Sequence, residues 1–317
     1  MATDGRNDYL SILDKAWQAH LAPREADAPT VISTFAGGGG SSLGYSMAGF
    51  RELLAVEWDQ NAVDTFRLNF LEVPVYHGDI AKMSTEQVFE LTGLKEGELD
   101  VFDGSPPCQG FSTAGKREMS DSRNQLFREY VRLLRGLKPK VFVMENVSGM
   151  VKGKMKLIFA EILRELKASG YRVSARLMNA MYFNVPQSRE RMIFIGIRED
   201  LGIEPSHPRA AEKPIPLREI APDAIGCKSQ QINPWIPASR PYCTIQKAAF
   251  LRETIRTMTG QREPTERELR LFGSFPQQMQ FAGDKDSQWE RIGNSVPPLF
   301  MKAIAQHIRE QILSKSC

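Results

Sequence analysis

The chain lacks the cysteine and histidine patterns that bind metals or cross-link small secreted domains. Only four cysteines occur among its 317 residues, none of them in a CxxC pair, and the four histidines lie far from them in the sequence. Zinc sites draw their ligands from clustered cysteines and histidines, so we expect no metal site. Four widely spaced cysteines in a chain of this length are typical of reduced thiols rather than a disulfide framework.

A signal peptide and a membrane-spanning segment are also missing. The first ten residues, MATDGRNDYL, contain no basic stretch followed by an apolar one. No apolar run approaches the roughly 18 residues that a membrane helix needs. We therefore expect a soluble cytoplasmic protein with no membrane contact.

A large excess of charge is absent as well. The formal net charge at pH 7 is +3, and 42% of the residues are hydrophobic and 25% charged. This composition is typical of a packed globular protein and not of a disordered chain. Because no global positive field indicates a nucleic-acid partner, such a partner would have to meet a local basic patch.

The sequence is instead marked by an alternation of short apolar runs and helical stretches. Strands are expected over residues 30–35, 50–58, 73–79, 99–105 and 140–146, with two later ones at 171–180 and 191–198. Helices are expected between them, most clearly over 123–136 and 154–169. This alternation predicts an α/β fold with a doubly wound, mostly parallel sheet.

Composition divides the chain into four parts. Residues 1–29 hold a helical apolar stripe over 8–20 and a polar linker, and residues 30–198 hold the predicted sheet. Residues 199–261 form a loop-rich region, because eight prolines fall between 201 and 245 in sequence with little periodicity. Helical patterns return in residues 262–317.

A glycine-rich segment, TFAGGGGSSLGYSMAGF, begins at the end of the first expected strand and continues into a predicted turn and helix. Ligands of open α/β sheets bind beyond the carboxyl ends of the strands, and glycines let the backbone approach them closely. The segment matches neither the dinucleotide nor the phosphate-loop pattern, because Ser42 replaces a glycine of the first and Tyr45 the lysine of the second. A tight turn without a ligand is the alternative interpretation.

Acidic and aromatic residues end the next two strands. Glu57 follows the glycine loop at the distance of about 20 residues that suits contact with ribose hydroxyls. Trp58 can cover an adenine ring, and Asp79 can accept from its amino group. These residues favour a nucleoside cofactor without a pyrophosphate, of which S-adenosylmethionine is the best candidate.

The stretch FDGSPPCQGFS places Cys108 after the fourth expected strand. A lone free cysteine is usually a buried packing residue, which is the alternative here. However, Glu145 ends the fifth strand, and Arg189 and Arg191 stand at the mouth of another. If the fourth and fifth strands are neighbours, the thiol and the carboxyl meet at one edge of the sheet. Surface salt bridges are the alternative for each arginine taken separately.

These blocks occur in an order typical of one family. FAGGGG with EWD, GSPPCQGFS, ENV, QSRERMIFIG, REPTERELRLFGSFP and RIGNSVPP together cover the chain from about residue 31 to 300. With them, the chain resembles the DNA cytosine carbon-5 methyltransferases. The resemblance implies a Rossmann-like catalytic and cofactor-binding domain over 30–198, a short target-recognition region over 199–261, and a C-terminal segment over 262–317 that returns to the catalytic domain.

The resemblance also implies a mechanism. A target cytosine would be flipped out of the duplex, and the Cys108 thiolate would add to its carbon 6. Carbon 5 would then accept the methyl group of S-adenosylmethionine, leaving S-adenosylhomocysteine. Glu145 in its protonated form would relieve negative charge at N3, Arg191 would face the base carbonyl, and Arg189 would help to shape the site.

The resemblance assigns binding residues as well. Cofactor contacts are expected from Phe35, Ala36, Gly37, Gly39, Gly40, Glu57, Trp58, Asp79, Ile80, Leu126, Asn294 and Ser295. DNA contacts are expected from Gln109, Ser112, Lys116, Arg117, Arg123 and Arg240.

The chain departs from the family pattern in two places. Ser33 stands where the family usually has an aspartate, so a carboxylate that could contact the methionine part of the cofactor is missing there. The recognition region is short, although residues 226–262 carry six basic side chains and one acidic side chain. Such a basic patch suits phosphate contact.

Several alternatives remain open. A tRNA-directed relative would share the catalytic blocks, and a catalytically weak DNA-binding paralogue would share the fold. The presence of Cys108 and Glu145 argues against the second. Our main expectation is a bacterial, archaeal or phage-encoded enzyme that acts as a monomer on double-stranded DNA, with a cognate restriction endonuclease acting separately if one exists.

Overall fold

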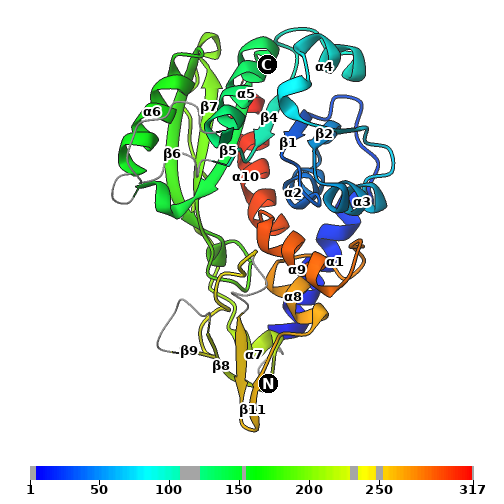
Figure 1. Ribbon diagram of the computed structural model, residues 1–317, viewed down its shortest axis with the longest axis vertical. Helices are drawn as coiled ribbons and strands as arrows, with labels where there is room; N and C mark the ends of the chain where they lie inside the picture. Colours follow the sequence, from blue (N-terminus) through cyan, green and yellow to red (C-terminus); the bar gives the residue numbers. More distant parts are fainter. Residues whose placement is uncertain (1–4, 108–121, 152–154, 229–234, 248–252, 316–317) are drawn as a thin grey trace.

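A seven-stranded mixed sheet forms the centre of the larger part of the protein (Figure 1). The computed structural model describes residues 5–107, 122–151, 155–228, 235–247 and 253–315. The strand order is β3-β2-β1-β4-β5-β7-β6. Their bounds are β1 Thr30–Thr34, β2 Arg51–Glu57, β3 Val75–His77, β4 Val101–Gly104, β5 Val141–Val147, β6 Tyr171–Asn179 and β7 Glu190–Arg198.

The sheet has the doubly wound arrangement that the sequence predicts. Strands β1 to β5 run parallel to one another, and β7 is antiparallel to both β5 and β6. Every residue of β1 is buried, as expected for a central strand covered on both faces. The strand order changes direction between β1 and β4, because the chain builds one half of the sheet outward from β1 and the other outward from β4. Ligands are expected to bind beyond the carboxyl ends of these two strands.

Helices cover both faces of the sheet. They are α1 Gly5–Leu21, α2 Gly40–Met47, α3 Gln60–Asn69, α4 Thr85–Thr92, α5 Ser122–Leu137, α6 Met155–Lys167 and α10 Pro298–Gln311. Short 3-10 turns are η1 Ile80–Lys82, η3 Ser148–Val151, η4 Ala180–Tyr182, η5 Glu199–Leu201 and η7 Leu313–Lys315. The helices expected over 8–20, 123–136 and 154–169 are thereby confirmed, with ends that differ by a few residues.

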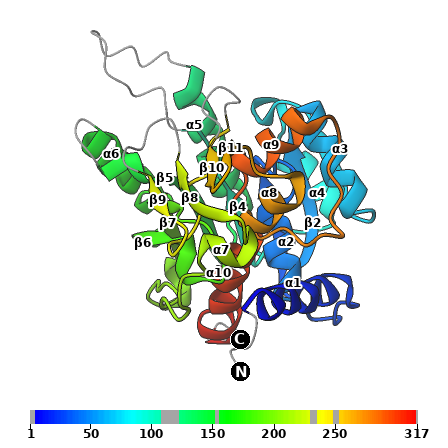
Figure 2. The same ribbon diagram turned by 90° about the horizontal axis from the view of Figure 1, so that it is seen from below.

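Two apolar cores lie on opposite sides of the sheet. Leu43 of α2 and Ile304 of α10 belong to one core, whereas Tyr130 of α5 and Ile162 of α6 belong to the other. Figure 2 shows α1 and α10 on one side of the strands and α5 and α6 on the other. Helix α10 therefore packs beside the large sheet, mainly against α2.

The region after β7 contains a second, smaller sheet that the sequence did not predict. Its strands are β8 Ala224–Lys228, β9 Ile236–Pro237, β10 Thr254–Thr257 and β11 Gly260–Arg262, in the antiparallel order β11-β10-β8-β9. Strands of two to five residues are too short to show the alternation by which strands are recognised. The last strand also crosses the expected boundary at residue 261 by one residue.

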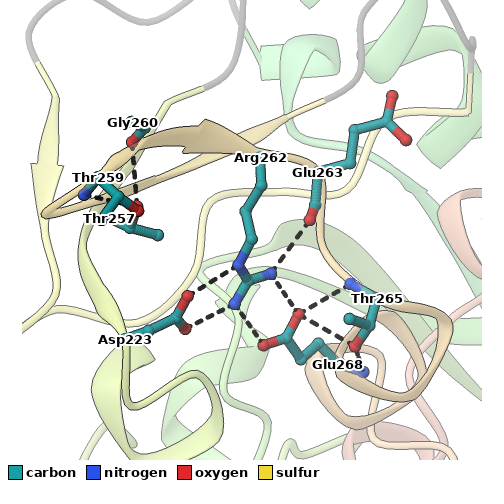
Figure 3. A network of polar contacts seen from close by, with 8 residues as sticks. All are labelled: Asp223, Thr257, Thr259, Gly260, Arg262, Glu263, Thr265 and Glu268. Atoms are coloured by element: carbon teal, nitrogen blue, oxygen red, sulfur yellow. Dashed lines mark hydrogen bonds and ion pairs between the residues drawn. The ribbon is translucent and has the colours of Figure 1, made fainter.

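Three helices accompany the small sheet: α7 Leu217–Ile220, α8 Glu266–Phe272 and α9 Lys285–Asn294. Figure 1 shows the sheet at the opposite end of the molecule from α4, with α8 and α9 between it and the larger part. Arg262 joins β11 to two neighbours (Figure 3), because its guanidinium donates two hydrogen bonds to Asp223, at 2.9 and 2.6 Å, and two to Glu268, at 2.7 and 2.8 Å. Glu268 also closes the capping box that begins α8 at Thr265. The small sheet is thus fixed to α8 through one arginine.

Among the residues described, none of the helices is long and apolar enough to cross a membrane. Two of the four cysteines, Cys227 and Cys243, are described, and both are buried free thiols.

Candidate active site

A pocket of about 670 Å³ opens beyond the carboxyl ends of β1, β2, β4 and β5. Its size is that of a small-molecule site. All of the expected cofactor residues except Gly39 line it: Phe35, Ala36, Gly37, Gly40, Glu57, Trp58, Asp79, Ile80, Leu126, Asn294 and Ser295. Gly39 faces the opposite way, since a Cβ at this position would lie 2.5 Å from the ring of Phe70. Its role in the loop is therefore to form a turn, because its φ of 91° is in the left-handed region.

The glycine loop is held in place by the carboxylate of Glu57. One oxygen accepts from the amide of Gly37 at 2.7 Å, and the other accepts from the amides of Trp58 and Asp59 at 2.8 and 2.9 Å. Glu57 is 9% exposed. The sequence pattern assigned this residue to the cofactor ribose, and the structure adds a second task, which is to fix the loop.

The C-terminal block reaches the same pocket through a different set of contacts. Arg291 of α9 donates to Asp59 at 2.9 Å, across more than 200 positions of sequence, and Asn294 and Ser295 follow at the end of this helix. A Cβ at Gly40 would lie 2.5 Å from the carbonyl oxygen of Val296. The absence of a side chain at Gly40 therefore allows the loop and the C-terminal block to touch.

The pocket rim carries the expected aromatic and acidic groups. Trp58 is 76% exposed. The carboxylate of Asp79 begins η1 by accepting from the amide of Ala81 at 2.9 Å. Leu126 of α5 lines the same pocket.

The predicted nucleophile lies just outside the described residues. Pro106 and Pro107 line the pocket and end the described segment, so Cys108, Gln109, Ser112, Lys116 and Arg117 fall outside it. The side chain of Arg123 is outside the description as well.

The expected adjacency of the fourth and fifth strands is confirmed. Gly104 of β4 pairs with Met144 of β5, and Glu145 lines the same pocket as Pro107. Asn146 joins the two strand ends by donating to the carbonyl oxygen of Pro106 at 3.0 Å. This hydrogen bond fixes the turn that leads to Cys108. The ENV block is visible in the sequence, but the hydrogen bond is not.

Arg191 and Arg189 differ sharply in their surroundings. Arg191 forms an ion pair with Glu145, with 2.6 Å between Nε and Oε1. Arg189 does not line the pocket: it is 2% exposed and donates to the carbonyl oxygens of Ile245, at 3.1 Å, and Gly293, at 2.8 Å. The alternative interpretation of Arg189 as part of a surface salt bridge is therefore wrong. Its side chain joins the start of β7 to the recognition region and to α9.

The remaining predicted DNA residue, Arg240, is exposed in the recognition region and lies outside the pocket lining. No three His, Cys, Asp or Glu side chains of the described segments gather as a metal site would require.

Comparison with known proteins supports the resemblance found in the sequence. The model of the C-5 cytosine-specific DNA methylase family matches residues 29–233 and 225–310. The type II methyltransferase M1.HphI of Haemophilus parahaemolyticus is 33% identical over 88% of this chain and 86% of its own length. M.AquIA of Picosynechococcus is 38% identical over 69% of this chain and 86% of its own length.

Solved structures show the same fold. The S. pombe Dnmt2 methyltransferase superposes with a TM-score of 0.65 over 88% of this chain and 97% of its own, at 18% sequence identity. A Spodoptera frugiperda DNMT2 mutant superposes with a TM-score of 0.67 over 89% and 99%, at 17% identity. From the family match and the identity to its relatives, the chain belongs to the C-5 cytosine-specific DNA methylase family and is a DNA cytosine methyltransferase.

Proposed function

We propose that the protein transfers the methyl group of S-adenosylmethionine to carbon 5 of a cytosine flipped out of duplex DNA. The observation that carries this proposal is the meeting of three features in one pocket. The glycine loop, Glu145 and the turn leading to Cys108 line one pocket at the carboxyl ends of adjacent strands, and Arg191 reaches Glu145 from the start of β7.

The pocket fits this cofactor in shape and polarity. Gly37 has a φ of 56° and nothing within 4 Å of an added Cβ, so its backbone borders open space. Trp58 offers an aromatic face at the rim, and Glu57 and Asp79 offer carboxylates that suit hydroxyl and amino groups. When bound there, the cofactor would supply an electrophilic methyl group on its sulfonium.

The protein's own groups would activate the base. The Cys108 thiolate would form a bond to carbon 6, which makes carbon 5 nucleophilic. After transfer, a base would remove the proton on carbon 5, and the sulfur–carbon bond would break to restore the ring and the thiolate. Arg191 forms an ion pair with Glu145 at 2.6 Å, so the Glu145 carboxyl would have to exchange part of this contact for one with N3 when the cytosine enters.

Binding of DNA would involve both parts of the protein. The target carbon is shielded in a stacked duplex, so the base must leave the helix at a cost of a few kcal/mol. Lys116, Arg117, Arg123 and Arg240 are proposed phosphate contacts, with Gln109 and Ser112 near the base. The names of the relatives, which are type II methyltransferases, favour a role in restriction–modification. We further propose that the protein works as a monomer and that any cognate endonuclease acts separately.

Covalent trapping tests this proposal directly. A duplex that contains 5-fluorocytosine, incubated with S-adenosylmethionine, should form an adduct that survives denaturation, because fluorine cannot leave as a proton does. Cys108→Ser should form none, whereas the control Cys317→Ser should react as the parent does. The duplex should be drawn from sites identified by bisulfite sequencing of DNA from cells that express the protein. Methyl incorporation into tRNA but not into duplex DNA would contradict the proposal.

A further inference from the structure

The described wall of the pocket is rich in acids and poor in cations. Its acidic lining residues are Glu57, Asp59, Asp79, Glu129, Glu145 and Glu290. Among the described residues that line it, only Lys247 and Arg291 are basic. The proposed reaction brings anionic groups to this pocket, because every nucleotide of a DNA strand carries a phosphate. These two cations are therefore the candidates for binding such a group.

Arg291 of α9 is already occupied by partners within the protein. Its guanidinium pairs with Asp59 at 2.9 Å and with Glu290 at 3.0 Å, and only 8% of its side chain is exposed. Asp59 in turn begins α3, because its carboxylate accepts from the amide of Ala62. Arg291 thus holds α9 to the start of α3, and a shielded guanidinium with two carboxylate partners has little to offer an incoming anion.

Lys247 differs from Arg291 in both respects. Its side chain is 62% exposed, and its ion-pair partner in the described segments is Glu290, with 3.3 Å between Nζ and Oε1. The same oxygen of Glu290 also faces Arg291. Exposed ion pairs contribute little to stability, so an anion could replace Glu290 at the ammonium at small cost.

The backbone that carries Lys247 is firmly held by its neighbours. The amide of Gln246 donates to Glu253 at 2.9 Å, and the carbonyl oxygen of Gln246 accepts from Nε1 of Trp289 at 3.0 Å. A Cβ at Gly293 would lie 2.7 Å from this carbonyl oxygen, so α9 packs directly on the segment. A cation on a fixed backbone loses less conformational freedom when it binds a ligand.

Lys247 also stands where the recognition region meets the pocket. Among the described residues of the region 199–261, it is the one that lines the pocket. A cytosine that leaves the duplex for the pocket remains attached to its own phosphates, which come to the pocket mouth with it. An exposed lysine at this boundary is placed to receive one of them.

We propose that Lys247 binds a backbone phosphate of the flipped nucleotide, and that Glu290 holds the lysine side chain at the pocket until DNA arrives. The inference rests on the proposed flipping of a cytosine out of duplex DNA. Because phosphate is common to all nucleotides, this contact supplies affinity and orientation but reads no sequence. Lys247 is thus a positioning residue for the target nucleotide, and it does not touch the reacting atoms.

Salt-dependent binding and steady-state kinetics test the inference. The affinity of the whole protein for a duplex that contains its methylated site is measured at several salt concentrations. We expect Lys247→Ala to weaken binding about tenfold and to lower the slope of log affinity against log salt by about one. KM for the duplex should rise by a similar factor, whereas kcat and the affinity for S-adenosylmethionine should change little. Lys247→Arg should restore most of the duplex affinity.

Substitution of the partner glutamate should give a result of opposite sign. Glu290→Gln removes the carboxylate that competes with phosphate for Lys247, so duplex binding should strengthen about threefold at low salt. A purely structural ion pair predicts instead that both substitutions act in the same direction. Arg172→Ala is the charge-matched control, because it removes a cation at the amino end of β6, on the edge of the sheet opposite the pocket. It should leave affinity and salt slope nearly unchanged.

The outcomes separate this inference from the proposed function. Unchanged duplex affinity and salt slope in Lys247→Ala would overturn the inference, as would weaker duplex binding in Glu290→Gln with cofactor binding retained. A loss of affinity for S-adenosylmethionine alone would also overturn it, because the lysine would then bind the carboxylate of the cofactor. If Lys247→Ala does not fold, Lys247→Gln keeps the test. Failure of the parent protein to bind duplex DNA would instead contradict the proposed function itself.

Discussion

The guanidinium of Arg191 and the carboxylate of Glu145 form a largely buried ion pair. Nε and Oε1 are 2.6 Å apart, and only 14% and 13% of the two side chains are exposed. The pair joins antiparallel β7 to the carboxyl end of β5. We expect Glu145→Gln to slow methyl transfer about 100-fold or more, because it removes the group proposed to exchange a proton with the base. Arg191→Ala should act in the same direction by leaving a partly buried carboxylate unpaired.

A surface ion pair supplies the control for this experiment. Arg172 and Glu204 lie 2.7 Å apart, but their side chains are 40% and 80% exposed. Exposed pairs contribute little, so Arg172→Ala should leave the rate of methyl transfer nearly unchanged. Rates would be measured with labelled cofactor and duplex DNA, after thermal unfolding has shown that each variant is folded. Equal losses in Arg172→Ala and Arg191→Ala would argue against a special role for the pocket pair.

At Gly40 the glycine loop lies close to the C-terminal block. A methyl group there would lie 2.5 Å from the carbonyl oxygen of Val296 and 2.9 Å from Cβ of Ser295. Because both neighbours belong to the pocket wall, Gly40→Ala should weaken cofactor binding by at least tenfold and lower the free energy of unfolding by about 1–3 kcal/mol. Gly149→Ala is the control, since nothing lies within 4 Å of its added methyl group. Calorimetry and thermal unfolding would measure both variants.

The sequence predicted the larger sheet well because its strands are continuous apolar runs. All five residues of β1 are buried, and the polar residues that follow each strand mark one edge. Glu57, Trp58 and Asp79 could therefore be named from strand ends, and the family resemblance added residues such as Leu126 and Asn294. Eleven of the twelve expected cofactor residues line one pocket. Such patterns report on strand ends, which is where ligands bind in this kind of sheet.

Other features depend on pairing, which a single sequence does not display. Strand β2 contains an extra residue relative to β1 next to Glu52, which accepts a hydrogen bond from Ser42 of α2, and no pattern in the sequence indicates this irregularity. Arg189 was expected to help shape the site, but the sequence does not indicate its partners, which are the carbonyl groups of Ile245 and Gly293, far away in the chain. Strands β8 to β11 are too short for their alternation to be read, and only their antiparallel partners make them a sheet.

Arg262 offers a test of how the small sheet is held (Figure 3). Its guanidinium makes paired hydrogen bonds to both Asp223 and Glu268, a geometry that a lysine ammonium lacks. We expect Arg262→Lys to lower the free energy of unfolding by about 1–2 kcal/mol. DNA affinity should fall while cofactor affinity stays the same, because the pocket lies elsewhere. Lys285→Ala is the control, since it breaks an exposed pair with Glu263 in the same area.

A buried acid in the recognition region should make stability depend on pH. Glu253 is fully buried, and burial raises its pKa to about 8 from an ordinary value of 4.5. One oxygen accepts from the Gln246 amide at 2.9 Å, and the other has no partner among the described residues. Between pH 4.5 and 8 the unfolded chain loses this proton while the folded protein keeps it, so the contribution of the neutral acid to stability falls as pH rises.

Replacement by glutamine should remove that dependence. Relative to the parent, Glu253→Gln should gain stability steadily from pH 5 to 8, by at most about 5 kcal/mol, and the gain should level off above pH 8. Chemical unfolding at a series of pH values would measure the difference. Glu90→Gln, on the exposed face of α4, should show no such trend. A constant difference between parent and Glu253→Gln across this range would mean that the carboxyl is already ionised in the folded protein, with the nearby Arg189 as its counter-charge.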